Sequence, residues 1–281
     1  MKTIDTLIPD LEALLTGGLD SLDPDIVEAF GKRLAEVMAS RLQRSPREFT
    51  LRMSNIGKPC LRQLWLERVY PDKVEKLNAS TLLKFQYGDL LEELLLFLAE
   101  LSGHRVEGRQ DTQRIGSIVG HRDAVIDGVV VDVKSASTYS FRKFVDHLDK
   151  STDSFGYLDQ LQSYMHASQG DDCVTDKSRG AFLVIDKTLG HLCLDFHKYA
   201  PKDWESEYER RIEIVNGTEV PSRAFRPESD GKSGNTKLGV NCSYCSVKTS
   251  CYPGLRAFKY YGGPTFLVHV AREPNVEEIK L

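Results

Sequence analysis

Residues 120–134 read GHRDAVIDGVVVDVK, and this stretch decides how the centre of the chain folds. Two apolar runs flank the dipeptide Asp127-Gly128, which is a strong signal for a two-residue type I′ hairpin turn. With these two residues as the loop, Ile126 pairs with Val129 and the pairing continues outward in register. The pattern therefore predicts two antiparallel strands.

The same register places Asp123 opposite Asp132 and His121 opposite Lys134. Successive side chains of a strand alternate between its two faces, so these four project from one face. The other face is nearly all apolar and suits a buried core. It consists of Arg122, Ala124, Ile126, Val129, Val131 and Val133.

Two opposed carboxylates, with Cβ atoms about 5 Å apart, repel each other unless a cation lies between them. Hard oxygen ligands select Mg²⁺ or Mn²⁺, which stabilise charge developing on a phosphate. Lys134 would orient an attacking water, or take its proton if its own pKa is depressed. The alternative is a surface hairpin with one Asp–Lys pair and a solvated acid. The single register that produces the opposed acids, the lysine and the apolar reverse face favours a catalytic site.

Outward from the hairpin, helical and strand-like patterns alternate. Upstream, the expected helices cover 3–16, 24–44, a segment from Cys60 to Val69, and 80–101, with an extended stretch near 49–53. The expected strands cover 104–110, 118–126, 129–134, 181–186 and 192–197. Helices are expected over 139–149, 154–168 and 203–216. This order predicts an α/β class, with a central sheet flanked by helices.

The bulk composition is that of an ordinary globular chain, with 281 residues, 41% hydrophobic and 28% charged. No segment is long and apolar enough to span a bilayer, and acids stand where a signal peptide carries lysines. We therefore expect a cytoplasmic protein, or one in the host cytoplasm if it is viral, with no membrane partner. The net charge of −4 does not indicate nucleic-acid binding. Residues 31–70 nevertheless carry a net of +6, which suits either phosphate contacts or, from charge alone, a solvated helix face.

Cysteine spacing indicates a metal site. Cys242-x2-Cys245-x5-Cys251 is compact, and Cys60 lies far upstream. In an intracellular chain, such cysteines bind metal more often than they form disulfides. Four thiolates suit a 4Fe-4S cluster or zinc about equally. The remaining cysteines are expected to be structural: Cys173 and Cys193.

Several motifs resemble a known family. G-x-x-D followed by D-x-K on the next strand looks like motifs II and III of the PD-(D/E)XK nuclease superfamily. Gln160 and Tyr164, four apart on one helix face, resemble the Q-x-x-x-Y motif of its RecB-like exonuclease branch. The run GDLLE, which ends at Glu92, resembles the helical motif I. The interval between Asp123 and Asp132 is short for this branch, and in this respect the chain resembles compact phage-type or mitochondrial-maintenance-type exonucleases.

This resemblance implies roles for particular residues. Glu92, with Glu93 as the fallback, would join Asp123, Asp132 and the Val133 carbonyl in holding Mg²⁺ or Mn²⁺. Lys134 would activate water, while Gln160 and Tyr164 would position Lys134 or a phosphate. DNA contacts are expected from four further residues: Arg52, Lys58, Arg62 and His121.

The cysteine arrangement resembles the iron–sulfur module of RecB-like nucleases, including the CRISPR-associated exonucleases and AddB-type helicase-nucleases. There, one N-terminal and three C-terminal cysteines hold a 4Fe-4S cluster. By resemblance, Cys60, Cys242, Cys245 and Cys251 hold a structural 4Fe-4S cluster, with zinc as the alternative. The implied organisation has a helical N-terminal region, a restriction-endonuclease-like core with a mixed sheet, a linker or mobile loop, and a Cys-rich C-terminal block. The corresponding ranges are 1–46, 47–216, 217–240 and 241–281.

The expected function is a metal-dependent DNA exonuclease that works 5′→3′ on single-stranded ends. Its setting would be DNA repair, recombination or phage DNA processing. One alternative is an endonuclease of the same superfamily. Another is a non-catalytic nucleic-acid-binding protein with a metal cluster. The oligomeric state stays open.

Overall fold

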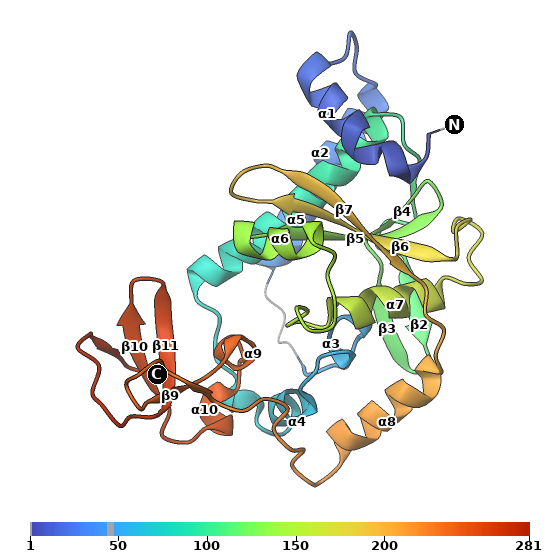
Figure 1. The fold of residues 1–281 in the computed structure, drawn as a ribbon. Helices are drawn as coiled ribbons and strands as arrows, with labels where there is room; N and C mark the ends of the chain where they lie inside the picture. The colour runs from blue at the N-terminus through green and yellow to red at the C-terminus, as the bar shows by residue number, and fades with distance from the viewer. Residues whose placement is uncertain (1, 44–47) are drawn as a thin grey trace. The chain divides into compact units, whose positions relative to one another are not determined.

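A computed structural model describes residues 2–43 and 48–281 (Figure 1). The chain divides into two compact units. The first contains the described parts of Met1–Gly57, with Leu77–Asp153 and Tyr157–Ser206. The second contains Lys58–Lys76, Ser154–Gly156 and Glu207–Leu281. The N-terminal helices thus belong to the same unit as the hairpin, and residues 58–76 group with the C-terminal part of the chain.

The first unit is built on a mixed five-stranded sheet, as expected for the α/β class. Its strands, in spatial order, are β1 (Val106–Glu107), β4 (Ala124–Ile126), β5 (Val129–Ala136), β6 (Arg179–Asp186) and β7 (Leu192–Lys198). Strands β5 and β6 are parallel and the other neighbours are antiparallel. A parallel pair needs a long crossover, which here contains α6 (Thr138–Val145) and α7 (Tyr157–Ala167).

The two faces of this sheet are covered by different helices (Figure 1). Val131 and Leu183 point to a core shared with α1 (Leu7–Gly17) and α5 (Ala79–Leu101). Because strand side chains alternate, Phe182 points the other way, where its ring meets Phe144 of α6 at 5.4 Å between centroids. Asp132 pairs with Phe182 and so lies on this second face.

The hairpin turn has the conformation that its sequence predicts. Asp127 and Gly128 have φ angles of 48° and 84°, as a type I′ turn requires. The predicted pairs Ile126–Val129, Val125–Val130 and Ala124–Val131 are confirmed.

The expected pairing does not continue beyond Ala124. His121 instead ends β3 (Ile118–His121), which pairs with β2 (Thr112–Ile115), so its predicted position opposite Lys134 is wrong. The break coincides with Arg122, which was expected to face an apolar core but is fully buried among polar partners. Its guanidinium lies 3.0 Å from Asp111 and 2.7 Å from Asp171. These ion pairs draw Arg122 away from the position that continued pairing with β5 would require.

Each expected helix has a counterpart in the structure, including α2 (Pro24–Leu42), α4 (Leu61–Val69) and α8 (Trp204–Asn216). Residue 44, the expected end of the second helix, lies outside the described residues. The extended stretch near 49–53 is reduced to one bridge, between Arg52 and Val119, followed by the short helix α3 (Met53–Ile56). Within the described residues, no helix is long and apolar enough to cross a bilayer.

The second unit contains an antiparallel sheet that the sequence patterns do not predict. Its order is β12 (Glu278–Ile279), β10 (Arg256–Tyr260), β11 (Gly263–His269), β9 (Thr236–Lys237) and β8 (Glu228–Ser229). Two short helices precede β10: α9 (Val240–Ser243) and α10 (Lys248–Cys251). Residues 217–240, expected to be a linker or mobile loop, therefore contribute two strands to this unit.

Candidate active site

Strand β5 supplies an acid and a lysine to one face of the sheet. Asp132 is 1% exposed, and its Oδ2 forms an ion pair with Lys134 Nζ. Asp132 Oδ1 is buried with no hydrogen-bond partner. An orphaned carboxylate oxygen is costly in a protein interior, so this atom is available for a cation. Burial raises the pKa of Asp132, and the lysine opposes that shift.

Asp123 reaches the same place from the other side of the hairpin. Its Oδ2 accepts a hydrogen bond of 2.7 Å from the backbone N–H of Val133. Burial, and then the charge of Asp132, raise the pKa of Asp123 to about 7. The two acids are thus close enough to repel each other, as expected, although Asp123 lies just outside the paired strand.

Helix α5 adds Glu92. Burial, and then the charge of Asp123, raise the pKa of Glu92 to about 9, and Gln110 Nε2 donates a 2.8 Å hydrogen bond to Glu92 Oε1. The fallback residue, Glu93, faces other partners: Arg33 Nε at 3.1 Å and Arg109 at 3.2 Å. Glu93 is therefore neutralised by two arginines, whereas Glu92 belongs to the acid cluster.

Helix α7 covers the cluster with two tyrosines. Burial, followed by the charges of Asp132 and Asp123, raises the pKa of Tyr164, whose side chain hydrogen-bonds to Gln160. Tyr157 was not among the predicted site residues, but its ring centroid lies 5.1 Å from Lys134 Nζ, within the range of a cation–π contact. The sequence could have identified Tyr157, because positions 157, 160 and 164 share one face of a helix.

Lys134 is a cation in this arrangement. Burial alone would lower its pKa, but the carboxylates of Asp132 and Asp123 raise it above the ordinary lysine value. The structure thus gives no support to the alternative in which a depressed pKa lets Lys134 take a proton. An ammonium group held here suits the other expected role, orienting water or phosphate.

The three acids fit a hard divalent cation by their chemistry. Glu92, Asp123 and Asp132 are oxygen donors, burial raises the pKa of each, and one of their oxygens is orphaned. Their carboxylates do not all lie within 4.8 Å of one another; among the described residues only one group of three ligands meets that limit.

The expected DNA contacts divide between the two units. Arg62 donates from Nη1 to the Pro221 carbonyl at 2.9 Å and so has a structural partner. Lys58 lines a pocket of the second unit, while Arg52 and His121 are exposed in the first. Part of the basic segment 31–70 also has internal partners: Arg33 binds Glu93, and Arg41 Nη2 lies 2.7 Å from Asp89 Oδ1.

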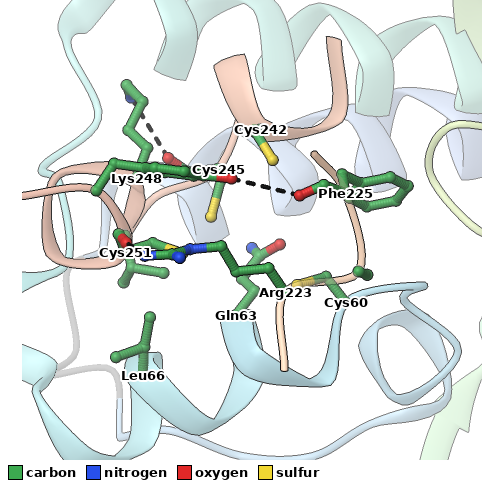
Figure 2. A pocket seen from close by; sticks show the side chains of 12 residues that line it. Cys60, Gln63, Leu66, Arg223, Phe225, Cys242, Cys245, Lys248 and Cys251 are labelled. Carbon is green, nitrogen blue, oxygen red and sulfur yellow. Dashed lines mark hydrogen bonds between the residues drawn. The ribbon is translucent and has the colours of Figure 1, made fainter. Parts of the chain in front are cut away.

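The four cysteines singled out by their spacing line one pocket of the second unit, and Figure 2 shows their sulfur atoms around it. Burial, and then Cys60 and Cys251, raise the pKa of the Cys242 thiol to about 11. Burial is also the main cause that raises the pKa of Cys245 to about 12. Arg223 enters the same pocket and donates to the Cys251 carbonyl at 2.5 Å. The remaining cysteines lie elsewhere: Cys173 contacts Arg122 at 3.1 Å, and Cys193 is on β7.

Comparisons with known proteins assign no activity to these sites. No protein-family model matches the chain, and no curated protein matches it. Among solved structures, the crystal structure of SSO0001 is similar, with a TM-score of 0.46 and 17% sequence identity. That likeness covers 82% of this chain and 96% of the other. Because it is too weak to carry an argument, the function rests on the chemistry of the site.

Proposed function

We propose that this chain is a metal-dependent DNA exonuclease with a restriction-endonuclease-like core, which hydrolyses phosphodiester bonds at the ends of single-stranded DNA. The observation that carries the proposal is the cluster of Glu92, Asp123 and Asp132, with the orphaned Oδ1 of Asp132 and the ammonium of Lys134 beside it. Titratable groups with strongly perturbed pKa values gather at catalytic sites more often than elsewhere.

Each residue has a role in this proposal. Glu92, Asp123 and Asp132 hold Mg²⁺ or Mn²⁺, and the ion supplies charge stabilisation for the reacting phosphate. Lys134 orients the attacking water through its ammonium group. Tyr157 limits the positions of that ammonium by lying against it, and Tyr164 and Gln160 close the site from α7.

The pocket of Cys60, Cys242, Cys245 and Cys251 is proposed to hold a 4Fe-4S cluster. Four thiols that line one pocket suit either a 4Fe-4S cluster or zinc. The order of the four cysteines along the chain resembles the iron–sulfur module described above, so the cluster is preferred and zinc is the alternative. The cluster would join Cys60 to the C-terminal strands and act structurally.

The test uses linear single-stranded DNA labelled at either end, and a circular single strand of the same sequence, with Mn²⁺. We expect wild type to degrade the linear strand from the 5′ end and to leave the circle intact. The Lys134→Ala variant should be inactive on both substrates. Cutting of the circle would point to an endonuclease. Binding of DNA without turnover by either protein would point to a non-catalytic binding protein and end the enzymatic proposal.

A further inference from the structure

A second group of metal-type ligands lies on β7 and on the segment that follows α6. His147 Nδ1 is 2.7 Å from Asp195 Oδ1, and His197 Nε2 is 2.9 Å from Asp195 Oδ2. One ligand atom from each residue lies within 4.8 Å of both others, and within the described part of the chain no other group of three is as tight. None of these residues belongs to the acid cluster or the cysteine pocket.

The fold brings these residues together in two ways. Asp195 and His197 are two apart on β7, so both side chains leave the same face. His147 comes two residues after the end of α6 and has a φ of 68°, a conformation that few residues other than glycine adopt. That turn lays the imidazole of His147 on the ring of His197, with centroids 4.5 Å apart and planes 17° from parallel.

The ligands are held firmly on one side and open to solvent on the other. Asp195 is 3% exposed and His197 is 8% exposed, while the His147 side chain is 64% exposed. The backbone N–H of Leu148 donates to Asp195 Oδ2 at 3.0 Å and fixes the carboxylate. An ion can therefore approach from the His147 side and find the other two ligands already oriented.

We propose that His147, Asp195 and His197 form a binding site for a divalent transition metal of the zinc type. Two imidazole nitrogens and one carboxylate oxygen are a donor set that such ions prefer to Mg²⁺, and three protein ligands leave a fourth position for water. The ring nitrogens that now face the carboxylate are the atoms that would coordinate. To coordinate, each imidazole presents the lone pair of that nitrogen and carries its proton on the other ring nitrogen, and the three groups separate slightly.

The position of this site gives the ion a structural role. Asp195 pairs with Phe182, and Phe182 pairs with Asp132, so the three residues form one row across the same face of the sheet. Two strand spacings place Asp195 about 10 Å from Asp132. The ring of Phe182 packs edge-on against His197, with centroids 5.4 Å apart. The ion would fasten the end of α6 to β7 and hold Phe182 in place.

Calorimetric titration with Zn²⁺, in excess Mg²⁺ to occupy oxygen-donor sites, tests the proposal on the full chain. The test variant is His147→Ala, which removes an exposed side chain and so preserves the fold. The matched control is His166→Ala, because His166 also faces an acid, Glu205 at 3.3 Å, but has no place in the ligand group. Zinc bound by the cysteines is common to all three proteins and cancels in the comparison.

We expect His147→Ala to bind one zinc ion fewer than wild type and His166→Ala, or to bind that ion at least tenfold more weakly. Crystals soaked in Zn²⁺ should show anomalous scattering bounded by His147, Asp195 and His197. Equal stoichiometry and affinity in the three proteins would overturn the proposal, as would an anomalous peak at the cysteines alone. Neither readout depends on DNA turnover, so the result stands apart from the proposed nuclease activity.

Discussion

Asp123 is fixed by a backbone group of the opposite strand: its Oδ2 accepts the N–H of Val133 at 2.7 Å. The paired part of the hairpin ends one residue earlier, at Ala124 and Val131. The carboxylate therefore replaces the next backbone partner across the strands, and this sets its orientation toward Asp132. A side chain anchored in this way is pre-oriented to bind a cation, because little rotational freedom remains to be lost.

Adjacent acids on α5 offer a matched pair of substitutions. Glu92→Gln should lower metal-dependent DNA hydrolysis about 100-fold or more, the usual effect of removing one group that stabilises reacting charge. Glu93→Gln should keep near-normal turnover but lower the free energy of unfolding by about 1–3 kcal/mol, because Arg33 and Arg109 lose a charged partner. Turnover assays and urea denaturation of both variants measure these effects. A greater loss of turnover in Glu93→Gln would reverse the assignment.

The acid cluster should make stability depend on pH in the absence of metal. The folded pKa values of Glu92 and Asp123 are about 9 and about 7, above unfolded values of about 4.3 and 3.9. The native state then binds more protons than the unfolded state between these limits, so stability falls as pH rises. Melting temperatures in EDTA should therefore decrease from pH 5.5 to 8.5.

Two controls isolate this effect. Mn²⁺ should stabilise the protein most at the higher pH, because the acids must be deprotonated to bind it. Glu92→Gln should flatten the pH dependence in EDTA, since one of the two raised groups is removed. A wild-type melting temperature that rises over the same pH range in EDTA would contradict the account of the cluster.

The cysteine pocket predicts that four of the six cysteines are needed for the cluster and two are not. Serine at Cys242 or Cys245 should abolish the visible charge-transfer absorbance of an iron–sulfur cluster and lower the bound iron. Serine at Cys173 or Cys193, which lie outside the pocket, should leave both unchanged. Absorbance spectra and iron analysis of anaerobically purified protein measure this. Stoichiometric zinc without iron in wild type would support the zinc alternative.

The hairpin turn depends on Gly128. A Cβ at this position would overlap the Thr175 hydroxyl, and the φ of 84° disfavours any side chain. Gly128→Ala should lower the free energy of unfolding by about 1–3 kcal/mol, and by more than Gly116→Ala does. Gly116 is the matched control, because its φ is also positive, at 54°, but an added Cβ meets no atom within 4 Å. Equal losses in denaturant titrations would show that Thr175 contributes nothing.

Local signals in the sequence account for the hairpin and most helices. Asp127-Gly128 specifies the turn. Because side chains along the next strand alternate between the two faces of the sheet, the register then specifies which of them enter the core. The break before Ala124 was not predictable, because it depends on ion pairs between Arg122 and Asp171, which is distant in sequence. The second sheet escaped prediction because several of its strands are only two residues long.

The candidate site, like the fold, was predictable where it depends on residues close together in the sequence. Residues on one hairpin could be related to each other by register, whereas the choice between Glu92 and Glu93 could not be made from helical phase. It required Arg33, which lies 60 residues away and neutralises Glu93. The ligand group of His147 and Asp195 was also missed, since the two residues are 48 apart in sequence.

The central claim is that Glu92, Asp123 and Asp132 form a site for a catalytic cation. The most direct test is equilibrium binding of Mn²⁺, followed by electron paramagnetic resonance, to wild type, Asp132→Asn and Glu93→Gln. We predict one Mn²⁺ ion per chain in wild type and in Glu93→Gln, and at least tenfold weaker binding in Asp132→Asn. Binding that is equally strong in all three proteins would contradict the claim.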